Sequence, residues 1–266
     1  MNRGVQLCGL VLVVCLAPMA FAQTTQVNLT GVVGQSYDGI YISPYYATVG
    51  GATNTPIICD DFADESKLPS TWTATATSFS SISSSPANTS WALAGNSMTL
   101  PGPLGQLYGE VGYFATLLLS PSIQGTTNQI IYTSAMWAVF DPTGVEQWLT
   151  SGSHGSTSGI STGDLCTAIF GTEGCAWKVG DTLGGQLATA YAASASGQYS
   201  NLVVLSPNNS NGTICAAEHG CAAQEFIYVS VPDGGTAAAY LLLSGFCCLG
   251  AIFLRSRRRL APRMLA

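Results

Sequence analysis

Alternation of apolar and polar residues predicts several short strands in this chain. Residues 27–49 alternate, carry aromatic and β-branched side chains and are punctuated by glycines, which predicts a pair of strands. Residues 72–79 (WTATATSF) alternate again and predict another strand. Residues 201–206 and 224–231 predict two closing strands. We expect the opening and closing strands to pair with one another.

Helical spacing of apolar residues appears in the middle of the chain. It predicts helices at 108–119 and 129–140, the second ended by Asp141-Pro142, and a short helical turn at 145–149. A third helix is expected from Asp181 or Thr182 onward. Met136, Trp137 and Phe140 are interpreted as core residues of an amphipathic helix.

Small polar residues fill the remaining stretches. Residues 80–105 and 150–163 are rich in Ser and Gly and predict loops, the first with a short strand near 91–94. The predicted fold class is therefore α+β. We expect an antiparallel β-sandwich-like or barrel-like domain at 23–230, with two or three inserted helices.

The first 22 residues have the organisation of a secretory signal peptide. Arg3 supplies a positive start, residues 5–16 are apolar, and Ala20-Phe21-Ala22 is a small-residue cleavage site. The sequence thus predicts a mature, exported chain that begins at Gln23.

The last 36 residues have three parts. VPDGG is followed by an uncharged apolar run at 236–254 and by a basic cluster at 255–263. A membrane-spanning helix needs about 20 apolar residues, so the predicted fold includes one C-terminal transmembrane helix. Arginines beside a span stay in the cytoplasm, which predicts that the chain before Val231 lies outside the membrane.

This tail resembles the PEP-CTERM-type sorting signal in its VPDGG or VPDSG variant. The resemblance implies recognition by a membrane protease-transpeptidase, an exosortase, followed by cutting and by release or attachment at the cell surface. The corresponding sorting motif is Val231, Pro232, Asp233, Gly234 and Gly235, and the basic stop is Arg255, Arg257, Arg258 and Arg259.

Charge is distributed unevenly along the chain. All 14 acidic residues lie between Asp38 and Asp233, whereas Lys67 and Lys178 are the only basic residues in that part. Nucleic-acid binding requires Lys and Arg against the phosphates, so this composition argues against a nucleic-acid partner. The Ser-, Thr-, Asn- and Gly-rich surface suits extracellular surroundings, with an extracellular polysaccharide or protein as partner.

The cysteines fit an oxidising compartment. We expect disulfides Cys166–Cys175 and Cys215–Cys221, each bracketing a Gly-containing loop, although four cysteines allow three pairings. A zinc site with His219 as ligand is the rival interpretation, but neither spacing is the short zinc-knuckle spacing. We expect no metal and no cofactor.

Cys59 is left without a partner and precedes a run of acidic residues. Asp60, Asp61, Asp64 and Glu65 could favour a hard cation such as calcium. The EF-hand spacing is absent, so we interpret this stretch as a solvated acidic turn. A lone cysteine is typical of a small buried apolar residue.

The exterior domain carries a second, more distant resemblance. ICDDF and IYTSAMWAVF, with the opening and closing strands, resemble an exterior domain of PEP-CTERM-type proteins and, distantly, thioester adhesin domains. In the adhesins a cysteine bonds to a glutamine two residues before an alanine of the A-I-W motif. Here Thr133 holds that place before Ala135, Gln129 lies one helical turn earlier and Gln147 lies well after.

The sequence gives only weak indications of a catalytic site. His154 lies in a Ser-rich loop, but no G-x-S-x-G motif is present. A carboxylate pair could come from Asp60, Asp61, Glu110 or Asp141. We therefore expect a non-enzymatic secreted or cell-surface protein of the envelope or biofilm matrix. The alternatives are a surface adhesin that binds a glycan or protein partner, with Cys59 as its candidate reactive thiol, and a secreted hydrolase.

Overall fold

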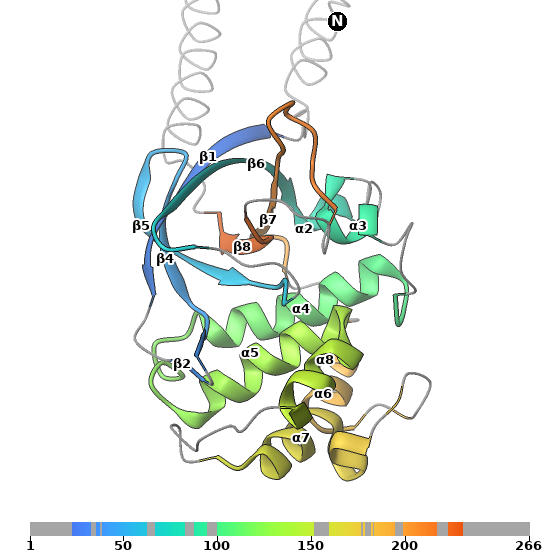
Figure 1. Ribbon diagram of the computed structural model, residues 1–266. Helices are drawn as coiled ribbons and strands as arrows, with labels where there is room; N and C mark the ends of the chain where they lie inside the picture. The colour runs from blue at the N-terminus through green and yellow to red at the C-terminus, as the bar shows by residue number, and fades with distance from the viewer. Residues whose placement is uncertain are drawn as a thin grey trace, which may run out of the picture. The chain divides into compact units, whose positions relative to one another are not determined.

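Six antiparallel strands form a closed barrel in the computed structural model (Figure 1). Around the barrel the strands follow the order β1-β4-β5-β8-β7-β6, and β6 pairs back onto β1. Their bounds are β1 Gln23–Val32, β4 Tyr45–Val49, β5 Ala52–Cys59, β6 Ser70–Ser78, β7 Leu202–Pro207 and β8 Phe226–Val229. A separate two-stranded hairpin joins β2 (Ser36–Tyr37) to β3 (Ile40–Tyr41).

The chain divides into two units, Met1–Val229 and Ser230–Ala266. The structure describes residues 23–32, 36–37, 39–62, 67–82, 88–94, 100–151, 160–176, 178, 182, 184–194, 199–216 and 223–230. Except for Ser230, these residues all belong to the first unit. The signal peptide expected at 1–22 and the sorting tail expected at 231–266 lie outside the described residues.

Residues at every second position of a strand point into the barrel and fill its interior. Val27 and Leu29 of β1 are fully buried, while the polar residues beside them are exposed. They pack with Trp72, Phe226 and the other members of one apolar cluster. This is the period-2 burial that a strand with one core-facing side produces.

The hairpin between β4 and β5 shows how a short motif determines local structure. Val49 pairs with Ala52, so Gly50 and Gly51 alone make the turn. Both glycines have positive φ, 56° and 93°. Two-residue hairpin turns with positive φ at both positions match the twist of the strands and strongly favour glycine.

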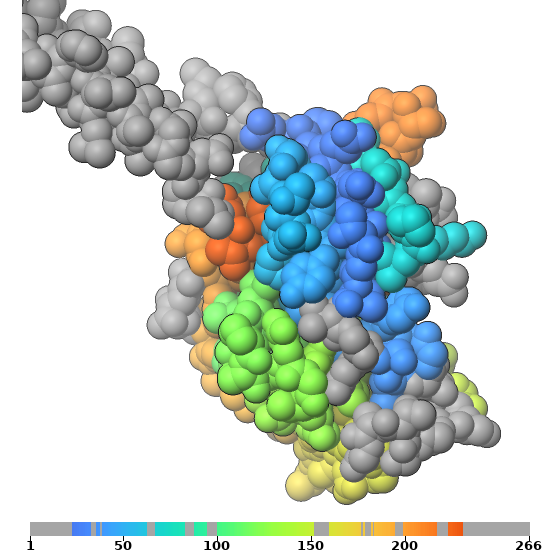
Figure 2. Space-filling view, turned by 90° about the vertical axis from the view of Figure 1, so that its left-hand side faces the viewer, coloured from blue at the N-terminus to red at the C-terminus, as the bar shows by residue number. Residues whose placement is uncertain are grey.

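A layer of helices packs against the outside of one part of the barrel. Figures 1 and 2 show the strands lying directly over the green helices α4 and α5. Ile58 of β5 and Ile227 of β8 point away from the barrel interior and join the apolar cluster of the helices. The helices are α2 Phe79–Ile82, α3 Ser90–Ala94, α4 Leu104–Leu118, α5 Thr127–Phe140, α6 Pro142–Ser151, α7 Thr162–Phe170, η2 Gly171–Ala176 and α8 Gly185–Ser194.

Helix α5 lies at the centre of this layer. Ten of its 14 residues are buried, including Met136, Trp137 and Phe140, so the prediction that these three are core residues is confirmed. Buried Gln129, Thr133 and other polar residues share the same helix. The helix is therefore surrounded by protein on most sides, rather than amphipathic with one exposed face.

The predicted number of helices is wrong. Seven α-helices occur among the described residues, where two or three were expected. Residues 91–94, expected as a strand, belong to α3, and the segment between Cys166 and Cys175, expected as a loop, contains the last four residues of α7. Short Ser- and Gly-containing segments carry little hydrophobic periodicity, and their helices are stabilised by tertiary contacts such as buried Trp91.

The predicted pairing of opening with closing strands is also wrong. Strand β1 pairs with β4 and β6, whereas β7 and β8 pair with each other and with β6 and β5. Strand β6 lies between β1 and β7. Sequence periodicity defines the faces of a strand but not its neighbours.

The predicted fold class must also be corrected for its membrane helix. No helix in the described part of the chain combines the length and the apolar character needed to cross a membrane. The segment expected to do so, 236–254, lies outside the described residues. The observed fold class is therefore α+β, with a closed six-stranded antiparallel barrel and a layer of helices.

Candidate functional site

Three acidic or thiol side chains are buried where the end of β5 meets the start of β8. Cys59 pairs with Phe226 across the β5–β8 ladder, and Asp60 N donates to Glu225 O at 3.4 Å just beyond it. Because side chains alternate along a strand, Cys59 joins the barrel interior, whereas Asp60 and Glu225 lie on the side of the helices. Cys59, Asp60 and Glu225 are each 0% exposed.

Glu225 is held by donors from three different elements. Ser90 N of α3 donates to Glu225 Oε2 at 2.7 Å. The hydroxyl of Tyr108 (α4) donates to Oε1, and the hydroxyl of Ser206 (β7) donates to Oε2. Three donors favour the ionised form of a carboxyl group, although burial raises the pKa of Glu225.

Asp60 has the opposite environment. Neither of its carboxyl oxygens accepts a hydrogen bond from an N–H or a hydroxyl. Burial first, and then the charges of Glu225 and Asp61, raise the pKa of Asp60 well above its usual value. The two residues are neighbours just beyond the β5–β8 ladder, so the negative charges of their carboxyl groups oppose each other. Burial without a hydrogen-bond donor therefore favours the protonated form of Asp60, whereas three donors favour the ionised form of Glu225. We call Asp60 and Glu225 the carboxyl pair.

Asp61 completes this acidic cluster. It is 1% exposed, and its backbone carbonyl accepts from Cys59 Sγ at 3.0 Å and from Gln224 Nε2 at 2.8 Å. The prediction of a solvated acidic turn is therefore wrong for Asp60 and Asp61, because the ladder beyond β5 draws them inward. Asp64 and Glu65 lie outside the described residues. No group of three His, Cys, Asp or Glu side chains in the described part of the chain is arranged to hold a metal ion.

Cys59 is a buried free thiol in the described structure. Its backbone N–H donates to Ser43 Oγ at 3.0 Å, and its carbonyl accepts from Trp137 Nε1 at 3.1 Å. Burial, and then the charges of Asp61 and Asp60, raise the pKa of the thiol well above its usual value. A neutral thiol is a poor nucleophile, so the surroundings of Cys59 favour an inert core position.

The glutamine nearest to the adhesin-like motif hydrogen-bonds to Ser43, as Cys59 does, while the Cys59 thiol itself is free. Gln129 is 0% exposed; its Nε2 donates to Ser43 O at 2.8 Å and its Oε1 accepts from Gly125 N at 2.7 Å. Both polar ends of its amide are thus occupied. Thr133, which holds the motif's glutamine position, is also buried in α5.

The other two carboxylates considered for catalysis, Asp141 and Glu110, each accept a hydrogen bond within their own segment. Asp141 Oδ1 accepts from Gly144 N at 2.8 Å in the first turn of α6. Glu110 Oε1 accepts from Gln106 Nε2 at 3.2 Å within α4, and burial raises its pKa to about 7. Neither contacts the other through a described bond. His154 and His219 lie outside the described residues.

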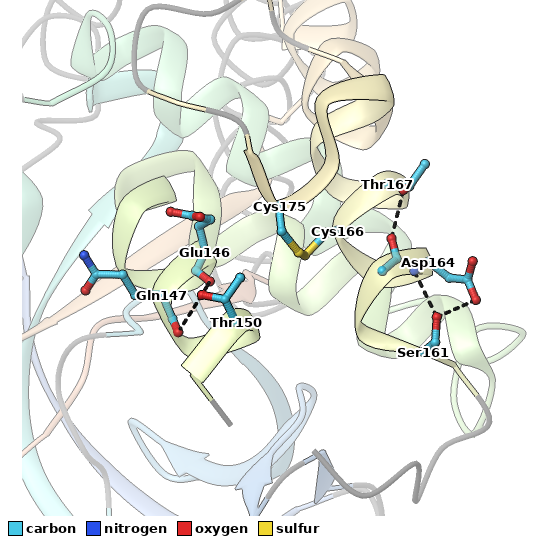
Figure 3. The surroundings of a disulfide bond; sticks show 9 residues. Glu146, Gln147, Thr150, Ser161, Asp164, Cys166, Thr167 and Cys175 are labelled. Atoms are coloured by element: carbon cyan, nitrogen blue, oxygen red, sulfur yellow. Dashed lines mark hydrogen bonds between the residues drawn. A yellow bond between two sulfur atoms is a disulfide. The ribbon is translucent and has the colours of Figure 1, made fainter. Parts of the chain in front are cut away.

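The Cys166–Cys175 disulfide is confirmed (Figure 3). It joins α7 to η2, with Cα atoms 5.1 Å apart. Ser161 caps α7 by accepting from Asp164 N at 3.1 Å. Cys215 is also disulfide-bonded, and its predicted partner Cys221 lies outside the described residues. The sorting motif Val231–Gly235 and the arginines of the basic stop lie outside them as well.

Comparisons with protein-family models, with curated proteins and with solved structures gave no match. The arrangement described above therefore has to be interpreted from its own chemistry. Its main feature, the carboxyl pair, was only half visible in the sequence. The sequence indicates Asp60 as a candidate, but Glu225 lies within a predicted strand with nothing to mark it, and only the β5–β8 register brings the two together.

Proposed function

We propose that this chain is an exported, non-enzymatic protein of the cell surface or extracellular matrix, sorted through its VPDGG tail. The observation that carries this proposal is the Cys166–Cys175 disulfide. Structural disulfides persist in oxidising compartments and are rare in the cytosol. A disulfide therefore supports the export that the first 22 residues suggest.

Charge supports the same assignment. The exported part holds only Lys67 and Lys178 as basic residues, against acids spread from Asp38 onward. Such a chain has few cationic side chains to bind nucleic acid or anionic lipid, because recognition of both depends on Lys and Arg. This charge distribution is compatible with an acidic protein that stays soluble among neutral polymers.

The surroundings of the reactive groups favour a structural role. The carboxyl pair is fully buried, and the three donors to Glu225 tie α3, α4 and β7 together. Cys59 is enclosed with its thiol donating to a backbone carbonyl. We therefore rank the hydrolase and the thiol-dependent adhesin below a binding or structural protein.

Intact mass tests the proposal directly. The protein is recovered unreduced from its own cells, and its mass is measured before and after reduction. We expect a chain that begins at Gln23, ends near Val231–Gly235 and gains the hydrogens of its reduced disulfides. A mass that reaches Ala266 would contradict sorting by cleavage, and a mass that includes Met1 would contradict signal-peptide removal.

A further inference from the structure

A pocket of about 230 Å³ lies where α4 meets α2, the end of α8 and the turn before β7. Three aromatic side chains line it, Phe79, Tyr108 and Tyr199, together with three serines, Ser80, Ser194 and Ser200. Ser80 and Ser200 are exposed, so the pocket is reached from the surface. It lies next to the carboxyl pair, because Tyr108 lines the pocket and its hydroxyl donates to Glu225.

Two glycines of α4 bring the walls of the pocket together. A Cβ atom at Gly109 would lie 2.9 Å from Ser194 Cβ, and one at Gly112 would lie 2.7 Å from Tyr199 Cγ. Both distances are shorter than van der Waals contact allows. The absence of side chains at these positions therefore lets the end of α8 and the ring of Tyr199 pack directly on α4.

The aromatic walls are fixed before any ligand arrives. The rings of Phe79 and Tyr108 meet edge to face, with centroids 5.9 Å apart and an interplanar angle of 84°. Tyr108 is anchored by Glu225, and Tyr199 is 9% exposed and packs on Gly112. Rigid walls reduce the entropy that a ligand loses on binding.

The lining is neutral and rich in hydroxyl groups. No charged side chain of the described residues lines the pocket, and each serine hydroxyl can both donate and accept. Ser194 Oγ donates to Tyr191 O at 2.7 Å, which leaves its lone pairs able to accept. Behind Tyr108, the acidic side chain of Glu225 disfavours an anionic ligand.

We propose that this pocket binds one ring of a neutral sugar, as part of an uncharged extracellular polysaccharide. The C–H face of a sugar ring packs well on aromatic rings, and its hydroxyls need partners that donate and accept. The volume lies below the roughly 300–1,000 Å³ of pockets for drug-sized ligands, which suits a single ring. This inference rests on the proposed extracellular function and specifies what the protein binds there.

Ligand-observed NMR on the full-length chain tests this proposal. The probes are the neutral sugars methyl glucoside, methyl galactoside and N-acetylglucosamine, compared with anionic glucuronate and cationic choline. We expect saturable binding of at least one neutral sugar in the millimolar range, and no saturable binding of glucuronate. Choline tests whether the aromatic walls bind an organic cation instead.

Gly105→Phe would fill the pocket from the exposed second position of α4. Gly163→Phe is the matched control, because Gly163 is the exposed second residue of α7 and does not line the pocket. Ser200→Trp, on the turn before β7, fills the pocket from another element if the first variant does not fold. We expect a pocket-filling variant to weaken sugar binding at least tenfold and the control to change it less than twofold.

Several results would overturn the proposal. These are no saturable binding of any neutral sugar, equal binding by the folded pocket-filling variants, or saturable binding of choline or glucuronate alone. None of them would affect the proposed export and sorting, which the intact mass decides separately. A full-length mass with normal sugar binding would in turn reject the sorting but keep the pocket.

Discussion

Asparagine at position 60 removes the titratable carboxyl group of Asp60. Asp60 is fully buried and accepts no hydrogen bond from an N–H or hydroxyl, and its pKa is raised by burial and by the charges of Glu225 and Asp61. An Asn side chain has nearly the same shape and carries no ionisable group. The Asp60→Asn variant should therefore keep the packing while losing the contribution of Asp60 to the pH dependence of stability.

The magnitude follows from linkage between protonation and folding. An unfolded aspartate has a pKa of about 3.9, whereas the folded pKa of Asp60 is raised well above that. The stabilisation by protonated Asp60 is fully present below the unfolded pKa and is lost as pH rises through the folded pKa. Within that window each pH unit lowers the free energy of unfolding by about 1.4 kcal/mol.

Urea unfolding at about pH 5, 6 and 7 measures this slope, followed by the fluorescence of buried Trp91 and Trp137. Between the unfolded and the folded pKa of Asp60, we expect the free energy of unfolding of the wild type to fall more steeply than that of Asp60→Asn, by up to about 1.4 kcal/mol per pH unit. Glu173→Gln is the control, because Glu173 is exposed on η2. The control should retain the slope of the wild type.

Equal slopes in the wild type and Asp60→Asn would refute the assignment of the proton to Asp60. A strong loss of stability in Asp60→Asn at every pH would refute it as well. Such a loss would mean that the ionised Asp60 carboxylate makes interactions that the neutral amide cannot replace.

Three further changes have defined outcomes. Glu225→Ala removes the acceptor of the buried Ser90 N–H and of the Tyr108 and Ser206 hydroxyls, so we expect it to lower the free energy of unfolding by at least about 3 kcal/mol in urea titrations. Replacing both Cys166 and Cys175 by Ala opens a loop with a sequence separation of 9 and should cost about 2.5–3 kcal/mol, seen as a lower urea midpoint. Cys59, being 0% exposed, should resist iodoacetamide in the folded protein and react fully in urea, as mass spectrometry would show.

Each of these predictions has a contrary result. A Glu225→Ala variant as stable as the wild type would mean that the described donors find other acceptors. An unchanged urea midpoint in the double cysteine variant would remove the disulfide as a source of stability. Rapid alkylation of Cys59 under native conditions would show that its site opens, and would revive the thiol-dependent adhesin.

Local patterns in the sequence predicted the parts of the fold that local physics controls. The alternation in WTATATSF corresponds to β6, and the helical spacing at 108–119 and 129–140 corresponds to α4 and α5. The close cysteine pair at Cys166 and Cys175 correctly indicated a disulfide. In each case the residues that determine the structure lie within about 15 positions of one another, so one segment contains the whole signal.

Tertiary structure decided what depends on residues far apart in the chain. Closure of the barrel places β6 between β1 and β7. The β5–β8 register brings Asp60 against Glu225, and α4 adds Tyr108 to the same group. Burial then reverses the expected surroundings of Asp60, from a solvated carboxylate to a desolvated group with a raised pKa. The sequence shows which residues carry charge, but the desolvation that moves a pKa arises only when distant segments pack together.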